Sequence, residues 1–204
     1  MKITKYLHSC LLIKENEKTI LLDPGRYSVE VLPVFHDLDA IAITHEHPDH
    51  FDIPTVKKLY DQFPRLKIFS TESVKLILAK ENIAVQTEGT EIISLKAYPH
   101  EKAWMGGRVQ NVMVTLFGTL SHPGDSLSFE KAAQILALPV TAPWGSTTWA
   151  IEVAEKIKPK VIIPIHDSTW KDDFRKKMYD SMQDYFAQKG MDFRKAETGR
   201  EMEV

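Results

Sequence analysis

The stretch AITHEHPDHFD, residues 42–52, places three of the chain's eight histidines within six consecutive positions. It continues an apolar run containing isoleucine, which predicts a short buried strand. Side chains two residues apart at a strand end point to the same side, so His45 and His47 can converge on one ion. Asp49 and His50 add a carboxylate and another imidazole, and this ligand set suits Zn²⁺, Mn²⁺ or iron better than Ca²⁺. The stretch therefore predicts a transition-metal site at a strand end; the alternative is a polar surface turn with hydrogen-bonded histidines.

The composition is that of an ordinary folded protein. Apolar residues make up 43% and charged residues 26% of the 204 positions, a balance typical of globular domains. We expect a single domain over residues 1–204, although the length also allows two tightly packed lobes. The formal net charge is −2, and acidic and basic residues are interspersed without a basic block. We therefore expect no nucleic-acid partner.

Cysteine usage and the N-terminal stretch indicate where the protein works. The single cysteine, Cys10, excludes an internal disulfide and fits a reducing compartment. Residues 1–18, MKITKYLHSCLLIKENEK, lack the long apolar core and small-residue cleavage site of a signal peptide. We expect a cytoplasmic protein that acts on a small-molecule substrate and has no membrane partner. A homo-oligomer is compatible with the sequence.

Strand and helix patterns alternate along the whole chain. In the first half the sequence predicts a hairpin of 11–13 and 19–22, a strand at 40–44, a helix at 54–63, a strand at 66–70 and a helix at 71–82. In the second half it predicts strands at 90–100 and 111–122, a helix at 128–138, a short strand and loop at 139–145, a helix at 146–159, a strand at 160–167 and a helix at 171–190. The tail, 191–204, is ambiguous. Both halves carry histidines after strands, which suggests a weak internal two-fold repeat. The alternation of strands and helices favours a layered α/β fold with helices covering two sheets.

The six residues HEHPDH, 45–50, resemble the His-x-His-x-Asp-His signature of the metallo-β-lactamase fold hydrolases. The stretches HSCLLI…ILLDPG near the start and KPKVIIPIHDSTW near the end are also similar, so the resemblance spans nearly the whole chain. The branch that the chain looks most like is the compact one that contains L-ascorbate-6-phosphate lactonase. This resemblance implies a four-layer αβ/βα sandwich, in which two mixed sheets lie face to face with helices outside and the site lies at strand ends along one edge.

The resemblance also implies a set of ligands for two divalent cations, Zn²⁺ or Mn²⁺, with iron as a third option. It assigns His45, His47 and His100 to the first cation, Asp49, His50 and His166 to the second, and Asp125 to both as a bridge. A water shared by two cations loses a proton near neutral pH and becomes the expected nucleophile. The implied activity is metal-dependent hydrolysis of a small ester, lactone or phosphoester, with Asp49 as a catalytic proton carrier.

Other residues near the predicted site carry two interpretations each. His122, three residues before Asp125, is a candidate catalytic residue through substrate contact or a hydrogen bond, and otherwise a structural loop histidine. His8 lies near the mouth of the site or is simply packed. We expect Glu46 to point away from the ligands, His36 to be solvated and Cys10 to be a small buried hydrophobe.

Aromatic and flexible residues offer candidate pocket walls. Trp104, Trp144 and Trp170 follow predicted strands on the same edge as the ligands, whereas we expect Trp149 in a helix core. The residues WMGGR, 104–108, are a candidate flap in which Gly106 and Gly107 permit movement and Arg108 holds an anionic substrate; a solvated loop arginine is the alternative.

Three other functions remain open at this point, and one of them is an iron-based redox role. Relatives of this fold include nucleases, which carry an added domain that clamps the strand, and this chain has neither room for one nor a basic stripe. A non-catalytic metal-binding or sensing module is the other alternative. Seven ligands exceed the four that usually close a structural zinc site, which favours catalysis.

Overall fold

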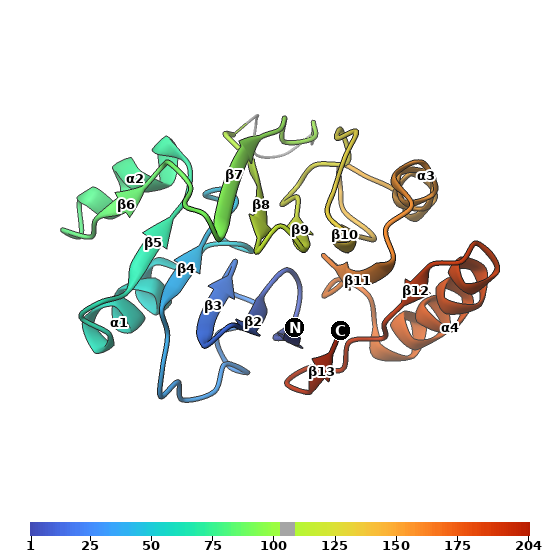
Figure 1. The fold of residues 1–204 in the computed structure, drawn as a ribbon, viewed down its shortest axis with the longest axis horizontal. Helices are drawn as coiled ribbons and strands as arrows, with labels where there is room; N and C mark the ends of the chain where they lie inside the picture. The colour runs from blue at the N-terminus through green and yellow to red at the C-terminus, as the bar shows by residue number, and fades with distance from the viewer. Residues whose placement is uncertain (103–108) are drawn as a thin grey trace.

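The computed structural model describes residues 1–102 and 109–204, and they form two β-sheets with four helices outside them (Figure 1). The candidate flap, with Trp104, Gly106, Gly107 and Arg108, lies outside the described residues. Its expected roles as pocket wall and anion contact therefore stay predictions.

The first sheet joins an antiparallel part to a parallel part. In spatial order its strands are β13 (Glu201–Glu203), β1 (Lys2–Lys5), β2 (Leu11–Glu15), β3 (Lys18–Leu22), β4 (Ala40–Ala42), β5 (Lys67–Phe69) and β6 (Val85–Gln86). The pairs from β13 to β3 are antiparallel and those from β3 to β6 are parallel. The buried strand β4 lies between β3 and β5, and the histidine-rich loop begins where β4 ends.

The second sheet has the same construction. In spatial order its strands are β12 (Asp192–Phe193), β11 (Val161–Ile165), β10 (Ile135–Pro139), β9 (Leu120–His122), β8 (Val112–Leu116) and β7 (Ile93–Ala97). The pairs from β7 to β9 are antiparallel, and those from β9 to β12 are parallel. Parallel strands point their carboxyl ends at one edge, and this edge therefore collects the loops that follow them.

Side-chain caps set the start of three of the four helices. These helices are α1 (Ile53–Gln62), capped by Asp52, α2 (Glu72–Ala79), capped by Thr71, and α3 (Thr147–Ile157), capped by Ser146. Each cap accepts a hydrogen bond from a backbone N–H of the first turn, a group that otherwise has no partner. The fourth helix, α4 (Asp172–Gln188), has no side-chain cap but begins with two aspartates, whose charge suits the positive end of the helix dipole.

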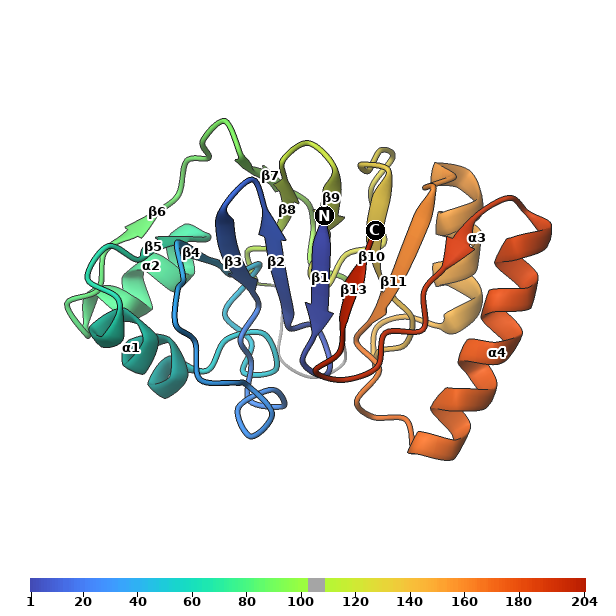
Figure 2. The same ribbon diagram turned by 60° about the horizontal axis from the view of Figure 1, so that its bottom comes forward.

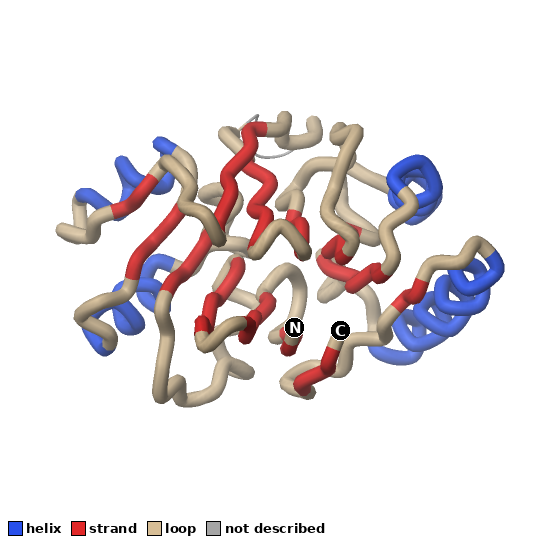
Figure 3. The backbone as a smooth tube through the Cα atoms, in the orientation of Figure 1, coloured by secondary structure: helices blue, strands red, loops and turns tan. Residues whose placement is uncertain are grey.

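Three apolar clusters define four layers. Between the sheets, residues such as Ile13 and Leu22 of the first sheet pack with Val114 and Ile163 of the second. A second cluster joins the outer face of the first sheet to α1 and α2, and a third joins the second sheet to α3 and α4. The two helix pairs accordingly lie at opposite ends of the molecule in Figures 2 and 3, with the strands between them. This is the four-layer αβ/βα sandwich expected from the sequence.

The order of elements repeats once. Three antiparallel strands, a fourth strand, and then helix, strand, helix, strand run from β1 to β6 and again from β7 to β12. The ambiguous tail supplies β12 and then β13, which pairs with β1 and brings the two ends of the chain together: Met1 N donates to Val204 O at 3.0 Å (Figure 1). The internal two-fold repeat suggested by the sequence is thus present in the topology.

The predicted strand at 111–122 is instead the antiparallel pair of β8 and β9, and residues 128–138 are not a helix. Residues 128–133 form an irregular loop, and the run continues as strand β10, all of whose residues are buried. A short continuous apolar run fits a buried strand as well as a buried helix. β10 pairs with β9 and β11 at its edges, one of its faces packs between the two sheets, and the other packs against α3 and α4. Burial in a parallel sheet outweighs the helix propensity of its alanine and leucines. The other predicted helices begin and end within a few residues of the structural ones.

Candidate metal centre

Seven predicted ligands come from loops of both sheets and converge where the carboxyl ends of their strands meet. His45, His47, Asp49 and His50 follow β4 of the first sheet, and His100, Asp125 and His166 follow β7, β9 and β11 of the second. Their side-chain atoms form two groups, which we call site one (His45, His47, His100 and Asp125) and site two (His8, Asp49, His50 and His166). Within each group, one nitrogen or oxygen from every residue lies within 4.8 Å of the others. Each group is therefore compact enough for one ion.

Site one consists of three imidazoles set nearly edge to face. The ring centroid of His45 lies 4.9 Å from that of His47 and 5.0 Å from that of His100. His100 Nε2 lies 3.2 Å from His47 Nδ1. Asp125 adds a carboxylate oxygen to these three rings, because its Oδ2 lies 3.3 Å from His100 Nε2. Four donor atoms thus surround one point, as in the three-histidine sites that bind zinc.

Site two is centred on one oxygen of Asp49. Asp49 Oδ2 lies 3.2 Å from His8 Nε2, 3.6 Å from His166 Nε2 and 4.0 Å from His50 Nε2. The side chain of Asp49 is 24% exposed, whereas those of His8 and His50 are buried. Asp49 is therefore the member of site two that solvent and a substrate can reach.

Asp125 lies between the two sites with one oxygen toward each. Its Oδ1 is 2.9 Å from His50 Nε2 and 3.3 Å from His166 Nε2, both of site two. Its Oδ2 is 3.3 Å from His100 Nε2 and 3.8 Å from His45 Nε2, both of site one. The carboxylate is 2% exposed. A bridging carboxylate needs this placement, because its negative charge offsets the repulsion between two nearby cations.

Buried polar atoms without partners support the presence of cations. Within residues 1–102 and 109–204, three buried side-chain atoms have no hydrogen-bond partner: His45 Nε2, Asp125 Oδ1 and His166 Nε2. Such atoms are rare in folded proteins, because each loses its hydration without compensation. All three belong to the two sites and point into them. The residues present therefore fit two divalent cations.

Residues behind the ligands fix the orientation of the rings. His50 Nδ1 lies 2.6 Å from Asp23 Oδ2, which also accepts a hydrogen bond from Thr44 Oγ1 at 2.7 Å. His100 Nδ1 lies 2.6 Å from the Glu101 carbonyl oxygen, so it donates and leaves Nε2 bare. Such partners set the tautomer of a metal-binding histidine. The sequence analysis uses ILLDPG for the family resemblance but does not single out Asp23; the signal was an acidic residue directly after a buried strand.

Burial and neighbouring charges set the protonation of the site. Burial, reinforced by His50, holds the pKa of His45 well below its usual range. Burial opposes protonation of His50 too, but the carboxylates of Asp125 and Asp23 outweigh it and raise the pKa of that ring. For Asp125, burial favours the neutral acid, but His166 and His50 outweigh it and hold the pKa well below its usual range. A cation therefore competes with a proton for His50.

His122 is fully buried behind site two, and both ring nitrogens have partners in the backbone. Nε2 donates to the Ser9 carbonyl oxygen at 2.9 Å, and Nδ1 accepts from Gly124 N at 3.3 Å. Of its two expected roles, this geometry favours hydrogen bonding in the loop over substrate contact. Its catalytic role stays a prediction.

Trp144 borders both sites. Its Nε1 donates to Asp125 Oδ2 at 2.8 Å, and its ring centroid lies 5.5 Å from that of His166. It therefore holds the Asp125 carboxylate in place and lies beside site two. Trp170 packs instead against Phe174 of α4, and Trp149 is partly buried against the core of the second sheet.

The remaining sequence expectations concern residues outside the site. Glu46 accepts a hydrogen bond from Ser73 Oγ at 2.6 Å, beside the start of α2, and so points away from the ligands. His36 is exposed and Cys10 is buried, both as expected. Burial raises the pKa of the Cys10 thiol, which disfavours the nucleophilic thiolate.

Two glycines let the backbone approach the ligand loops closely. A Cβ at Gly25 would lie 1.9 Å from the Asp49 carbonyl oxygen. Gly124 has a φ of +59°, and a Cβ there would lie 2.2 Å from Asn111 Oδ1, which accepts the hydrogen bond of Asp125 N. Any larger residue at either position would displace a ligand loop.

The chain is similar over most of its length to two proteins from other organisms, one of which is named a metal-dependent hydrolase. It is 28% identical over 188 residues to Protein Rv0786c of Mycobacterium tuberculosis, covering 86% of this chain and 88% of that protein. It is 27% identical over 195 residues to a UPF0173 metal-dependent hydrolase of Nanoarchaeum equitans, covering 83% of this chain and 85% of the relative.

A solved structure has the same fold. Igni18, a metallo hydrolase from the hyperthermophilic archaeon Ignicoccus hospitalis, superposes with a TM-score of 0.73 at 18% identity, covering 100% of this chain and 98% of Igni18. In the described part of this chain no helix has the length and apolar character needed to cross a membrane. Residues 2–166 match the family described as the beta-lactamase superfamily domain. The match covers well over half of the chain, and the protein belongs to this family.

Proposed function

We propose that the protein is a cytoplasmic metal-dependent hydrolase that uses two divalent cations, Zn²⁺ or Mn²⁺, with iron as a third option, on a small ester, lactone or phosphoester. The observation that carries the proposal is the position of Asp125. It is buried between two compact groups of ligands and turns one oxygen toward each of them. The names of the relatives and of Igni18 also support hydrolysis.

The residues of the site divide the work between them. When bound, divalent cations supply electrophilic activation and lower the pKa of water. The buried imidazoles of His45 and His50 keep bulk water from the inner side of the site. Asp49 holds a partly exposed carboxylate at the outer side, where it can take a proton from an attacking water and give it to a leaving group.

The exposed side of site two suggests an anionic substrate. The exposed ring of Tyr27 lies 4.9 Å from the ring of His8, and the guanidinium of Arg26 lies 5.3 Å from the centre of the Tyr27 ring. Arg26 is fixed to the ligand loop, because its backbone N donates to the Pro48 carbonyl oxygen at 2.8 Å. A phosphate or carboxylate group on the substrate would contact the Arg26 guanidinium near Asp49. The lactonase-like branch, which handles a phosphorylated lactone, agrees with such a substrate.

Chelation tests the hydrolase proposal. Metal is removed with a chelator, its loss is verified by elemental analysis, and turnover of a panel of lactones, phosphoesters and carboxylic esters is measured before and after Zn²⁺ or Mn²⁺ is returned. We expect turnover of at least one class to vanish with the metal and to return with it. A rate unchanged after verified metal removal would contradict the proposal. A protein that binds two ions and turns over no substrate of the panel would favour the metal-sensing alternative.

The proposed partner is a small molecule and not a nucleic acid. A nuclease of this fold would have to hold a polyanionic strand, which depends on neutralising phosphates and is strongest at low salt. Absence of RNA and DNA binding at low salt is the expected result, and tight binding there would favour the nuclease alternative.

A further inference from the structure

His8 occupies a position in site two that the proposed mechanism does not use. It lies on the turn between β1 and β2 and is 1% exposed. Its Nε2 is 3.2 Å from Asp49 Oδ2, closer than the Nε2 of either predicted histidine ligand of this site. Adjacent ligands of one zinc ion, at metal–ligand distances of about 2.0–2.2 Å, lie about 2.8–3.6 Å apart. His8 Nε2 is therefore placed as a neighbouring ligand would be.

The orientation of His8 also matches that of the other two imidazoles in site two. Each of the three turns Nε2 into the site and has Nδ1 on an oxygen outside it. The pairs are His50 with Asp23 at 2.6 Å, His166 with the Thr141 carbonyl at 2.8 Å, and His8 with Ser168 Oγ at 2.6 Å. An outer oxygen that holds the second ring nitrogen is the usual arrangement of a metal-binding histidine.

The backbone around His8 is held in an uncommon conformation. Leu7 and His8 have φ values of +55° and +47°, and His166 on the facing loop has +63°. Residues with side chains adopt this conformation at a cost, and it persists where surrounding contacts enforce it. His166 N donates to the His8 carbonyl oxygen at 3.1 Å, which fixes the two loops against each other.

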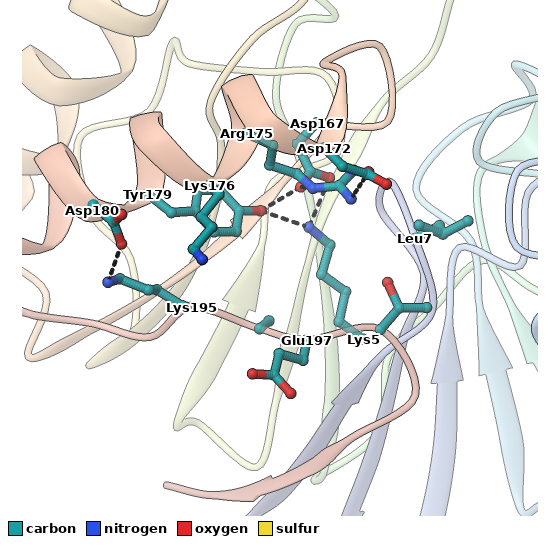
Figure 4. A pocket seen from close by; sticks show the side chains of 12 residues that line it. Lys5, Leu7, Asp167, Asp172, Arg175, Lys176, Tyr179, Asp180, Lys195 and Glu197 are labelled. Carbon is teal, nitrogen blue, oxygen red and sulfur yellow. Dashed lines mark hydrogen bonds and ion pairs between the residues drawn. The ribbon is translucent and has the colours of Figure 1, made fainter.

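Next to this turn, a buried polar network fastens the same two loops. Figure 4 shows Lys5 reaching Asp167 and Tyr179, with Leu7 on the adjoining turn. Lys5 Nζ donates to Asp167 Oδ1 at 2.7 Å, and the Tyr179 hydroxyl donates to Asp167 Oδ2. The network forms one wall of a cavity of about 490 Å³ beside α4. The turn of His8 and the loop of His166 are thus joined on both sides, so His8 is preorganised.

We propose that His8 is a ligand of the cation in site two, in addition to Asp49, His50 and His166. The site then offers three imidazoles and one carboxylate, besides the shared Asp125. This nitrogen-rich set favours Zn²⁺ over Mn²⁺ at site two, because imidazole suits zinc and oxygen ligands suit manganese. The inference rests on the metal binding within the proposed function and does not depend on hydrolysis.

The rival interpretation is a hydrogen bond from His8 to Asp49. In that case the Ser168 hydroxyl donates to Nδ1, and the proton on Nε2 is donated to the carboxylate. If His8 is a ligand, Nδ1 carries the proton and donates to Ser168, and Nε2 keeps a lone pair for the cation. The two interpretations differ in which nitrogen is protonated.

Nitrogen NMR of the zinc-loaded protein distinguishes them. Two-dimensional ¹H–¹⁵N spectra of the imidazole rings are recorded as Zn²⁺ is added, and the His8 signals are assigned by their loss in His8→Ala. We expect Nδ1 of His8 to be protonated and Nε2 to shift as a metal-bound nitrogen when the second zinc ion binds. A proton on Nε2 in the protein with two zinc ions bound would overturn the proposal. This measurement uses the wild type, and His8→Gln supplies the assignment if His8→Ala does not fold.

Metal affinity gives a second, independent readout. Competition with a chromophoric chelator measures both zinc dissociation constants in wild type, His8→Ala, Ser168→Ala and the control His36→Ala, which alters an exposed histidine. We expect the second ion to bind about 100-fold or more weakly in His8→Ala and about 10- to 100-fold more weakly in Ser168→Ala. The first ion and the His36→Ala control should be unaffected. Unchanged binding of both ions to folded His8→Ala would overturn the proposal, whereas a wild type that binds no ion would overturn the proposed function itself.

Discussion

At the scale of single residues, the proposal of two cations depends on Asp125. It is the residue that approaches the nitrogen donors of both sites, with one oxygen 2.9 Å from His50 and the other 3.3 Å from His100. Replacement of its charge should leave two cations without the group that offsets their repulsion.

We predict that Asp125→Asn binds one of the two ions at least about 100-fold more weakly, a larger loss than the removal of an outer hydrogen-bond partner produces. Turnover should fall by orders of magnitude, and the fold should persist, because asparagine has nearly the same shape. Isothermal titration with Zn²⁺ and circular dichroism provide the readouts.

Trp144→Phe is the matched control for Asp125→Asn. It keeps the carboxylate and an aromatic ring, and it removes the hydrogen bond from Trp144 Nε1 to Asp125 Oδ2 together with part of the ring packing. Both ions should still bind, with a smaller loss of affinity than in Asp125→Asn. Loss of an ion in Trp144→Phe but not in Asp125→Asn would show that the bridge has been assigned to the wrong group.

Arg26 is the residue through which we expect the charge of a substrate to be recognised. Arg26→Ala should raise KM for an anionic substrate about fivefold, equivalent to the ~1 kcal/mol of an exposed ion pair. It should change kcat little and leave a neutral substrate unaffected. Steady-state kinetics with a charged and a neutral ester check this, and Arg65→Ala, at another exposed arginine, is the control. An equal change in KM for the charged and the neutral substrate would show that Arg26 does not recognise the substrate's charge.

At the scale of elements, the ion pair of Lys5 and Asp167 fastens β1 to the loop that joins β11 to α4. Both side chains are buried, at 3% and 4% exposure, and their atoms are 2.7 Å apart. Removal of Lys5 leaves the buried Asp167 carboxylate without its nearest positive charge, because Arg175 Nε lies farther away, at 3.9 Å. We predict that Lys5→Met lowers the free energy of unfolding by about 3–5 kcal/mol, measured by urea denaturation near neutral pH.

The exposed pair of Lys18 and Asp39 is the matched control, with nearly the same separation of 2.8 Å but half-exposed side chains. Lys18→Met should cost less than about 1 kcal/mol. Equal costs for the two variants would contradict a special role for the buried pair.

The pH dependence of the Lys5→Met effect has a definite sign. Burial raises the pKa of Asp167, but Lys5 and Tyr179 outweigh it and lower that pKa in the folded protein. A lowered carboxyl pKa contributes stability that is complete above the unfolded value of about 3.9 and is lost as the pH falls through the folded value. The difference between wild type and Lys5→Met should therefore be largest near neutral pH and should narrow below about pH 4.

The sequence could predict the elements whose determining residues lie close together in the chain. The helices with side-chain caps at Asp52, Thr71 and Ser146 were readable, because their caps and apolar faces are set within a few residues. Strand β10 was misread as a helix because its two faces are buried by the first sheet and by α3 and α4, which lie elsewhere in the chain. The short strands β6, β12 and β13 had too few residues to show a period of two.

The site likewise combines residues that the local sequence reveals with residues that only the fold brings together. The ligands that follow β4 were visible as a string, and the distant ligands were found through the family resemblance. The structure adds Asp23 and gives His8 a place, two residues whose neighbours in sequence are apolar or turn-forming. Their significance comes from the loop of His50 and the loop of His166, which only the fold brings to them.

At the scale of the whole molecule, the candidate metal centre connects the two halves of the sandwich. The first half supplies His45, His47, Asp49 and His50, and the second supplies the other three predicted ligands. Cations bound there would fasten one sheet to the other. Each half repeats the same order of strands and helices, so the centre lies between two similar units.

We predict that bound metal stabilises the whole fold. A ligand that binds only the folded state adds about 2.7 kcal/mol at a free concentration 100 times its dissociation constant. For a chain of this length, this corresponds to an increase in Tm of about 5–10 °C. Calorimetry with saturating Zn²⁺ and with chelator should show this difference in wild type and a smaller one in Asp125→Asn. An unchanged Tm at verified metal saturation would mean that the ions do not connect the two halves.

Anomalous diffraction from crystals saturated with Zn²⁺ or Mn²⁺ tests the central claim most directly, because it locates each ion and counts it. We predict two anomalous peaks per chain, one on each side of Asp125, each about 2.0–2.2 Å from its ligands in site one or site two. A single peak, or two peaks that both lie away from Asp125, would contradict the account.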